Sequence, residues 1–238
     1  MDTPPERQQL RLWPTPLGIY QWSQASSANE VLVRVLSAMR ATDPGRAPGQ
    51  AASPFYASRD DLLQRIELPE WQALLRFIGE GIRDCAADAN GGWCEPGQNA
   101  PGLRIAIEGI WFQMSNRGAH HDIHTHGNCS WSGVYCLQVD GETERAAHPV
   151  FGALNGITRF YGPHFNQLGG AHMDMGSAYL QQPHIDLAPR PGQLLVFPSW
   201  LAHQAMPYEG SRARVIVSFN ASVHAAQGSN QRHAYARG

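Results

Sequence analysis

The residues best suited to metal chemistry lie in two short segments of the chain. Four histidines and one aspartate fall within residues 120–126, and His203 follows the largely apolar segment 197–202. Side chains two residues apart on an extended chain point to the same face, so His124 and His126 can bind one ion together. A third imidazole, from His203 on a distant strand, would complete a site on one side of the ion. Such a site keeps open coordination positions, which suits redox-active iron better than a closed structural site does.

The same segment contains rival ligands. His120 and Asp122 form a His-x-Asp pair, and on an extended strand this pair would share a face with His124 and His126. Parity alone therefore does not exclude His120 and Asp122, although we place them below the histidine pair. Asp122 or His121 could instead orient the ring of a metal ligand through a hydrogen bond.

If the metal's cosubstrate is a keto acid, the site also needs a cation nearby. Chelation through the keto-acid end leaves a remote carboxylate, which the planar fork of an arginine binds better than a lysine does. Arg214 opens the apolar run 215–219, and Arg212 lies two residues earlier and could face the same way. Tyr135 could donate a hydroxyl hydrogen bond to the same carboxylate, or it could be a buried core tyrosine.

The overall composition is that of an ordinary globular protein. The 238 residues suffice for one well-buried core, and the net charge of −2 and pI near 6.6 indicate no polyanion-binding surface. We therefore expect no nucleic-acid partner. The first residues lack the apolar core of a signal peptide, and no run is long enough to span a membrane. A cytoplasmic protein without a membrane partner is the resulting expectation.

The cysteines add little chemistry of their own. Cys85, Cys94, Cys129 and Cys136 form no CxxC pair and no dense framework, so reduced thiols are expected. Cys129 lies close to the histidine cluster and could be a ligand, but a small buried hydrophobic residue is the better interpretation.

Two amphipathic helices are predicted in the first part of the chain. Residues 29–40 place apolar side chains at helical spacing, with a Ser or Asn of segment 26–29 as the N-cap. A second helix is predicted to begin at Pro69 and to end at the Asn-Gly-Gly of residues 90–92. We expect both helices to pack on a sheet.

From Leu103 onward the hydrophobic period becomes that of strands. Strands are expected near residues 103–112, 133–139, 158–161, 193–197 and 213–219. Helices followed by strands predict a mainly β protein with a jelly-roll core. We expect a single domain, 1–238, with a helical part at about 1–100 and the core at about 101–224. Segment 141–192 has only one clear strand, so we interpret it as a lid-like insertion facing the substrate.

The segments quoted above resemble a known protein family, the bacterial 2-oxoglutarate- and iron(II)-dependent oxygenases. The family pattern has a His-x-His pair, a Ser-Gly-Val-Tyr-Tyr strand, a Phe-Pro-Ser-Trp-Leu-x-His block and a final Arg-x-x-x-x-Phe-Asn strand. In this chain these are residues 124–126, 132–136, 197–203 and 214–220, with Cys136 in place of the second tyrosine. The resemblance covers nearly the whole chain.

The resemblance implies the double-stranded β-helix (jelly-roll, cupin-like) fold, iron(II) bound by histidines and 2-oxoglutarate bound by a strand arginine. The residues that we accordingly expect to bind the cofactors are His124, His126 and His203 for iron(II), and Arg214, Tyr135, Arg212 and Asn220 for 2-oxoglutarate. The wider superfamily usually places an aspartate or glutamate where this chain has His126. An all-histidine site carries less negative charge than that arrangement.

These observations favour a 2-oxoglutarate-dependent dioxygenase that uses O₂ and releases succinate and CO₂. Its expected partner is a small-molecule or peptide substrate, and hydroxylation is the simplest outcome. One alternative is a three-histidine, cupin-like dioxygenase that binds its substrate directly and does not use 2-oxoglutarate. Another is a non-catalytic jelly-roll module whose histidines hold a structural zinc ion. The sequence specifies neither the substrate nor the oligomeric state.

Overall fold

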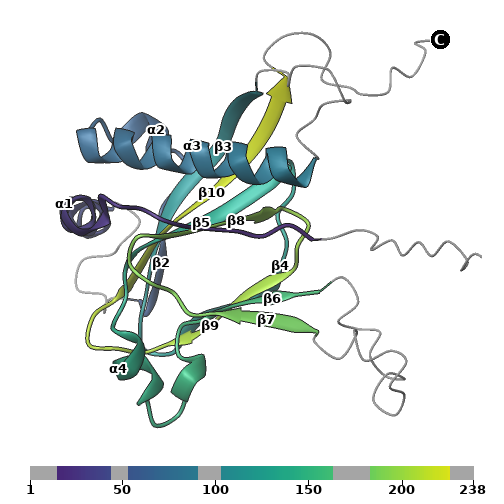
Figure 1. Cartoon of the computed structure of the whole chain (residues 1–238). Coiled ribbons are helices and arrows are strands. Elements are labelled where there is room, and N and C mark those ends of the chain that lie inside the picture. Colours follow the sequence, from purple (N-terminus) through teal and green to yellow (C-terminus); the bar gives the residue numbers. More distant parts are fainter. Residues whose placement is uncertain (1–14, 44–52, 91–102, 163–182, 226–238) are drawn as a thin grey trace, which may run out of the picture.

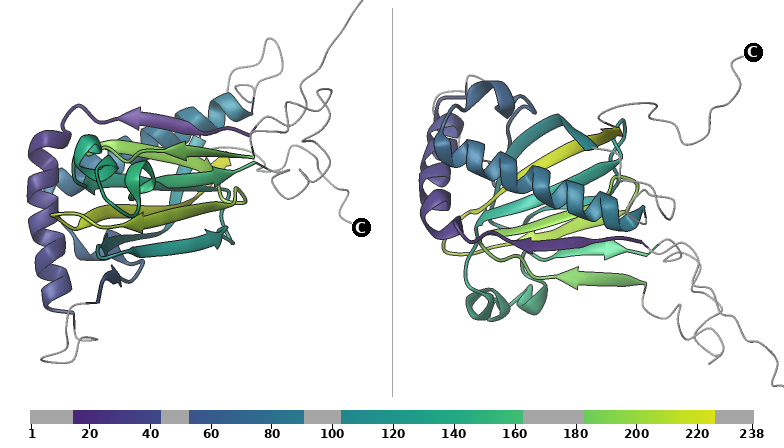
Figure 2. Two further views of the ribbon diagram at one scale, coloured as in Figure 1. Left: turned by 90° about the horizontal axis from the view of Figure 1, so that it is seen from below. Right: turned by 45° about the horizontal axis from the view of Figure 1, so that its top comes forward.

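The computed structural model describes residues 15–43, 53–90, 103–162 and 183–225, which form three layers (Figure 1). Helices cover one face of a six-stranded antiparallel sheet, and a four-stranded antiparallel sheet lies across its other face (Figures 1 and 2). The larger sheet has the strand order β1-β8-β5-β10-β3-β2, and the smaller has the order β4-β9-β6-β7. The strands are β1 (Gly18–Gln21), β2 (Phe55–Ala57), β3 (Leu103–Ser115), β4 (Ala119–His124), β5 (Trp131–Gln138), β6 (Thr158–Tyr161), β7 (His184–Leu187), β8 (Gln193–Pro198), β9 (His203–Tyr208) and β10 (Arg214–Ala225).

The strands from β3 to β10 build the expected jelly roll. Strands β3, β5, β8 and β10 belong to the larger sheet, and β4, β6, β7 and β9 make up the smaller one. The chain therefore crosses repeatedly between two facing sheets, as it does in a double-stranded β-helix. The predicted fold class is confirmed.

The five strands expected from the sequence are present as β3, β5, β6, β8 and β10. The other strands in the described parts of the chain were not predicted as separate strands. They have only three to six residues each, and a run that short shows little periodicity. Their place in the sheets comes from pairing with strands that are distant in sequence.

The helix predicted from Pro69 is confirmed as α3 (Pro69–Ala89), with Pro69 in its first turn and Asn90 after its last residue. The predicted helix at 29–40 is also present, but α1 (Ala25–Ala41) begins earlier, after Gln24, and no side chain caps it. The expected Ser or Asn cap is therefore wrong. The short helix α2 (Leu62–Arg65) precedes α3.

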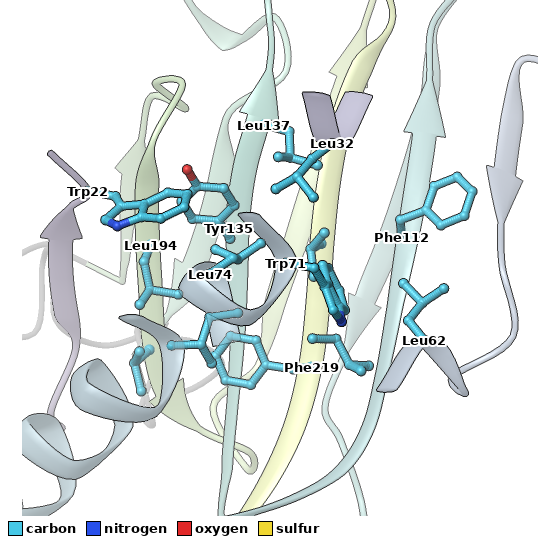
Figure 3. Close-up of a cluster of buried hydrophobic side chains, with 14 of the residues drawn as sticks. Trp22, Leu32, Leu62, Trp71, Leu74, Phe112, Tyr135, Leu137, Leu194 and Phe219 are labelled. Atoms are coloured by element: carbon cyan, nitrogen blue, oxygen red, sulfur yellow. The ribbon is translucent and has the colours of Figure 1, made fainter. Parts of the chain in front are cut away.

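The main hydrophobic core lies between the helices and the larger sheet (Figure 3). Leu32 of α1 and Trp71 and Leu74 of α3 are fully buried in this layer. From the strands, Phe112 and Tyr135 point into the same layer. Burial of this kind typically contributes about 3–5 kcal/mol for a large aromatic side chain, judged from truncation to alanine.

Strand alternation sends the neighbouring residues to the other face of the larger sheet. Trp111 and Gln113 alternate with Phe112 on β3, and Arg214 and Ile216 alternate with core residues on β10. These side chains face the smaller sheet. The helices therefore cover one face of the larger sheet, and the opposite face is available for a site.

The expectation that segment 141–192 is a lid-like insertion is wrong for its described residues. The segment contains α4 (Glu142–Ala146), the 3₁₀ helix η2 (Gly152–Leu154) and the strands β6 and β7, which form half of the smaller sheet. Arg145 is buried there and donates hydrogen bonds to the carbonyl oxygens of Asp140 and Asn155, at 3.1 and 2.8 Å. Residues 163–182 lie outside the described residues.

Candidate metal and cosubstrate site

Three histidines from two distant segments of the chain converge between the two sheets. His124, at the end of β4, pairs with His203, at the start of β9, and their ring centroids lie 4.3 Å apart. The Nε2 atoms of His126 and His203 lie 3.3 Å apart. One ring nitrogen from each histidine falls within 4.8 Å of the others, so the three can bind a single ion. The structure brings together the three residues that the sequence predicts as metal ligands.

Hydrogen bonds to backbone carbonyls set the orientation of two of these rings. The Nδ1 atom of His124 lies 2.7 Å from the carbonyl oxygen of Asp122, and that of His203 lies 2.9 Å from the carbonyl oxygen of Leu201. A carbonyl oxygen only accepts, so each Nδ1 carries the proton and each Nε2 keeps a lone pair. This is the arrangement that a metal-binding imidazole requires.

His126 lies in the cluster, but the strand alternation expected from the sequence does not place it there. Strand β4 ends at His124, so the alternation of an extended strand does not place His126. Its backbone N–H instead donates to the carbonyl oxygen of Ser199, at 2.9 Å. This bond ties the loop after β4 to the turn between β8 and β9, and the explanation from strand parity is wrong for this residue.

The rival ligands His120 and Asp122 are not part of the cluster. The side chain of Asp122 is 94% exposed and lies 3.7 Å from the ring of the half-exposed His120. The β4–β9 pairing shifts register between His121 and His124, and such an irregularity changes which residues share a face. His121 consequently faces the site, where its ring centroid lies 4.7 Å from that of Phe55. From the sequence we expect His121 at most to orient the ring of a metal ligand.

The histidines line a cavity of about 340 Å³ between the sheets. The residues around it are Phe55, Ala57, Trp111, Gln113, His121, His124, His126, Gly133, Val134, Thr158, His203, Ala205, Arg214, Ile216 and Ser218. Most of the wall is apolar or aromatic. Among the residues that the structure describes, no carboxylate lines this cavity, so its positive charge has no protein counterion.

Burial favours the neutral form of two of the histidines, His126 and His203. It lowers the pKa of His126 to about 4, and the neighbouring His124 and His121 act in the same direction. Burial also lowers the pKa of His203 to about 4, although the hydrogen bond to Leu201 works against that shift. Both rings are therefore neutral at pH 7 and can accept a cation without first losing a proton.

Arg214 is the one predicted cosubstrate ligand whose side chain lines the cavity. It is buried, and its Nη2 atom donates to Thr158 Oγ1 at 3.4 Å. Its Nε atom is buried and has no hydrogen-bond partner in the described part of the chain. Burial lowers the pKa of Arg214. A buried guanidinium with an unused donor is costly unless an anion binds it.

The other three predicted cosubstrate ligands do not line this cavity. The Tyr135 hydroxyl donates to Asn29 Oδ1 at 2.7 Å in the helix-side core, so the prediction for Tyr135 is wrong. Arg212 is exposed and forms an ion pair with Asp140 at 3.3 Å. Asn220 accepts a 2.8 Å hydrogen bond from Ser132. Each of these side chains is used elsewhere.

Residues 109–220 match the profile of a protein family described as "Putative 2OG-Fe(II) oxygenase". The matched region includes the three converging histidines and Arg214. Residues 109–220 form a 2OG-Fe(II) oxygenase domain. The family expected from the sequence is thus confirmed, and with it the cofactors of that family, iron(II) and 2-oxoglutarate. No curated protein sequence is significantly similar to the chain.

Solved structures of 2OG-Fe(II) oxygenases and related enzymes share the fold of this domain. A prolyl-4-hydroxylase from Pseudomonas putida is 13% identical, with 87% of this chain and 92% of that chain covered and a TM-score of 0.52. HygX from Streptomyces hygroscopicus, with nickel and 2-oxoglutarate bound, is 11% identical (94% and 90% covered, TM-score 0.53). The α-ketoglutarate-dependent epimerase SnoN from nogalamycin biosynthesis is 12% identical (92% and 87% covered, TM-score 0.55).

No helix in the described ranges of the chain is long and apolar enough to cross a membrane.

Proposed function

We propose that the protein is a 2-oxoglutarate- and iron(II)-dependent dioxygenase that hydroxylates a peptide side chain, an amino acid or a small metabolite. Succinate and CO₂ would be the products formed from the cosubstrate. The observation that carries the proposal is the shared cavity, in which three convergent imidazoles and the buried guanidinium of Arg214 line the same space. A structural metal site would have no need of the arginine.

The donor set fits iron(II). Three neutral imidazoles supply nitrogen ligands from one side and leave positions for a chelating cosubstrate and O₂. Bound iron(II) and 2-oxoglutarate would together supply the oxidising chemistry, and the protein would supply binding and orientation. His124 and His203 would bind through Nε2, because their Nδ1 protons are used by backbone carbonyls.

The charge balance of the cavity fits 2-oxoglutarate. An imidazole binds a metal in its neutral form, so a divalent ion held by the three histidines would keep its full positive charge, and Arg214 adds a further positive charge. A dicarboxylate offsets most of this charge, with one end at the metal and the other at the guanidinium. We propose that Arg214 donates to the distal carboxylate, beside the hydroxyl of Thr158, which already accepts from Arg214.

The remaining walls would exclude water around the reacting groups. Phe55, Trp111, Val134 and Ile216 are apolar or aromatic and line the cavity beside the histidines. A dry wall of this type strengthens the ionic contacts inside and protects reactive groups from water. We propose that the substrate enters against these side chains, near His121.

The test is a turnover assay with protein that has been loaded with iron(II) under anaerobic conditions. On addition of O₂ and 2-oxoglutarate, the wild-type protein is expected to form succinate, and the Arg214→Ala variant is expected to form far less. Arg212→Ala is the matched control, because Arg212 is exposed and pairs with Asp140 outside the cavity. Substrate oxidation without 2-oxoglutarate would favour the cupin-like alternative. A site filled by zinc with no open position would contradict both oxygenase assignments.

A further inference from the structure

A buried chain of polar side chains lies next to the metal-binding histidines. The Oγ atoms of Ser132 and Ser199 lie 2.9 Å apart, and Ser132 Oγ donates to Asn220 Oδ1 at 2.8 Å. At the other end, the Cys129 thiol lies 3.0 Å from Ser199 Oγ. Ser132 and Ser199 are almost completely buried. The hydroxyls face one another rather than water, so this is a built network.

The number of available protons determines which serine hydroxyl donates and which accepts in this network. Each hydroxyl carries a single proton, and the proton of Ser132 is used toward Asn220. The Ser199 hydroxyl must therefore donate to Ser132. The Cys129 thiol lies 3.0 Å from Ser199 Oγ and 3.3 Å from the carbonyl oxygen of Gly127, so its single proton serves one of these two acceptors at a time. Removing the hydroxyl of Ser199 breaks the chain in the middle and leaves Ser132 without its buried donor.

The backbone of Ser199 connects this network to the metal ligands. Its carbonyl oxygen accepts the N–H of His126 at 2.9 Å, and its own N–H donates to the carbonyl oxygen of Ser130 at 2.9 Å. His203 begins β9 four residues later. Ser199 thus sits between the loop that carries His126 and the turn that leads to His203.

Nothing in the sheet ladder would otherwise place His126. Strand β4 ends two residues before it, and the following loop contains exposed residues and Asn128 with a positive φ of 58°. A loop of this kind has several accessible conformations unless hydrogen bonds restrict it. The contacts from the loop to Ser199, through His126, Cys129 and Ser130, supply that restriction.

We propose that Ser132, Ser199 and Asn220 are positioning residues that hold the His126 loop on the β8–β9 turn. Together they fix the place of His126 relative to His203. This proposal rests on the metal site of the proposed function. These three residues lie in the segments that resemble the family pattern, and the proposed function assigns none of them to metal or cosubstrate binding. The positioning role gives them a common purpose.

The main test is the Ser199→Ala variant, loaded with cobalt(II) as a spectroscopic probe. Loss of a group that supports a metal ligand typically lowers metal affinity 10- to 100-fold. We expect a decrease in that range, together with a changed visible spectrum of the bound cobalt(II). Tyr135→Phe is the matched control, because it removes a buried hydroxyl hydrogen bond from strand β5 on the helix side. It should leave affinity and spectrum unchanged.

A second pair of variants keeps the test informative if Ser199→Ala does not fold. Cys129 is only partly buried, so Cys129→Ala and Cys129→Ser should both fold. The alanine removes the thiol contact with Ser199 and should weaken cobalt(II) binding by about two- to ten-fold, the factor for one hydrogen bond. The serine keeps a donor and should bind nearly as the wild type does. Equal affinities and spectra for wild type, Ser199→Ala and Cys129→Ala would overturn the proposal.

Amide hydrogen exchange at His126 separates this proposal from the proposed function. Its N–H donates to the carbonyl oxygen of Ser199 at 2.9 Å, so exchange in metal-depleted protein should be slow in the wild type and faster in Ser199→Ala. If exchange follows this pattern but no metal binds, the loop restraint holds and the oxygenase function fails. If metal binds and exchange is identical in both proteins, the positioning role fails instead.

Discussion

The Nε2 atoms of His126 and His203 lie 3.3 Å apart, although 77 positions separate the two residues in sequence. The Nδ1 atom of His203 already donates to Leu201, so its Nε2 atom presents a lone pair to His126. A metal ion held by these histidines would accept a lone pair from each Nε2 atom, so we propose that the ion binds at this contact.

Each single alanine variant of the three histidines is expected to lose most of its bound metal. Each of His124→Ala, His126→Ala and His203→Ala removes one of three protein ligands, so the purified variants should contain much less than one iron per chain after reconstitution. Asp122→Ala and His120→Ala are the controls, since the side chain of Asp122 is 94% exposed and pairs with His120, which lies outside the cluster. Metal analysis by mass spectrometry gives the answer. Iron loss in Asp122→Ala with retention in His126→Ala would reverse the ligand assignment.

Removal of the buried arginine should act mainly on the cosubstrate. Arg214→Ala loses charge-assisted hydrogen bonds, which are worth about 1.5–3 kcal/mol in total. The Michaelis constant for 2-oxoglutarate should therefore rise on the order of 10- to 100-fold in a succinate assay, with iron content unchanged. Arg214→Lys keeps the charge without the planar fork, so its Michaelis constant should lie between those of the wild type and Arg214→Ala. An unchanged Michaelis constant in Arg214→Ala would show that Arg214 does not bind 2-oxoglutarate.

The stability of the metal-free protein should fall as the pH drops from about 6.5 toward 4. Burial lowers the pKa of His126 and His203 to about 4, from 6.5. Above pH 6.5 these rings are neutral in both the folded and the unfolded chain. Between the two values only the unfolded chain takes up their protons, which favours unfolding.

Urea unfolding midpoints, measured between pH 7.5 and 4.5 with a chelator present, test this pH dependence. The double variant His126→Gln, His203→Gln lacks both groups and should show a shallower decline over that range. Parallel curves for the double variant and the wild type would show that these histidines do not cause the effect.

Tyr135→Phe should reduce stability without affecting cosubstrate binding. The hydroxyl of Tyr135 donates to Asn29 Oδ1 at 2.7 Å, and both residues are buried. The variant leaves that oxygen without its donor, at a cost of about 1–3 kcal/mol in the free energy of unfolding. Denaturation and the Michaelis constant for 2-oxoglutarate are the two measurements. A raised Michaelis constant at unchanged stability would return Tyr135 to the cosubstrate site.

The sequence was sufficient to single out the three histidines that converge and the arginine that lines the same cavity, because residue type and local pattern carry most of that information. A His-x-His pair, a histidine after an apolar strand and an arginine opening a strand are rare combinations. Tyr135 shows the limit of the pattern. Alternation indicates that Tyr135 and Val134 face opposite sides of β5, but not which side the helices cover.

Two other features depend on pairing between distant strands and could not be predicted from the sequence. His121 faces the cavity because the β4–β9 register shifts between His121 and His124, and a local pattern contains no sign of that shift. Likewise, the strands β6 and β7 have only four residues each. Their pairing in the smaller sheet decides that segment 141–192 is part of the core.

The most direct test of the central claim is an anaerobic titration of the iron(II)-loaded protein with 2-oxoglutarate. Chelation of the iron produces a visible charge-transfer absorption. Three histidine ligands and Arg214 in one cavity predict that this band appears and saturates at one 2-oxoglutarate per chain. In Arg214→Ala the same band should require a much higher concentration. If iron binds in the wild type but 2-oxoglutarate produces no band, the cavity is not a cosubstrate site and the dioxygenase assignment is wrong.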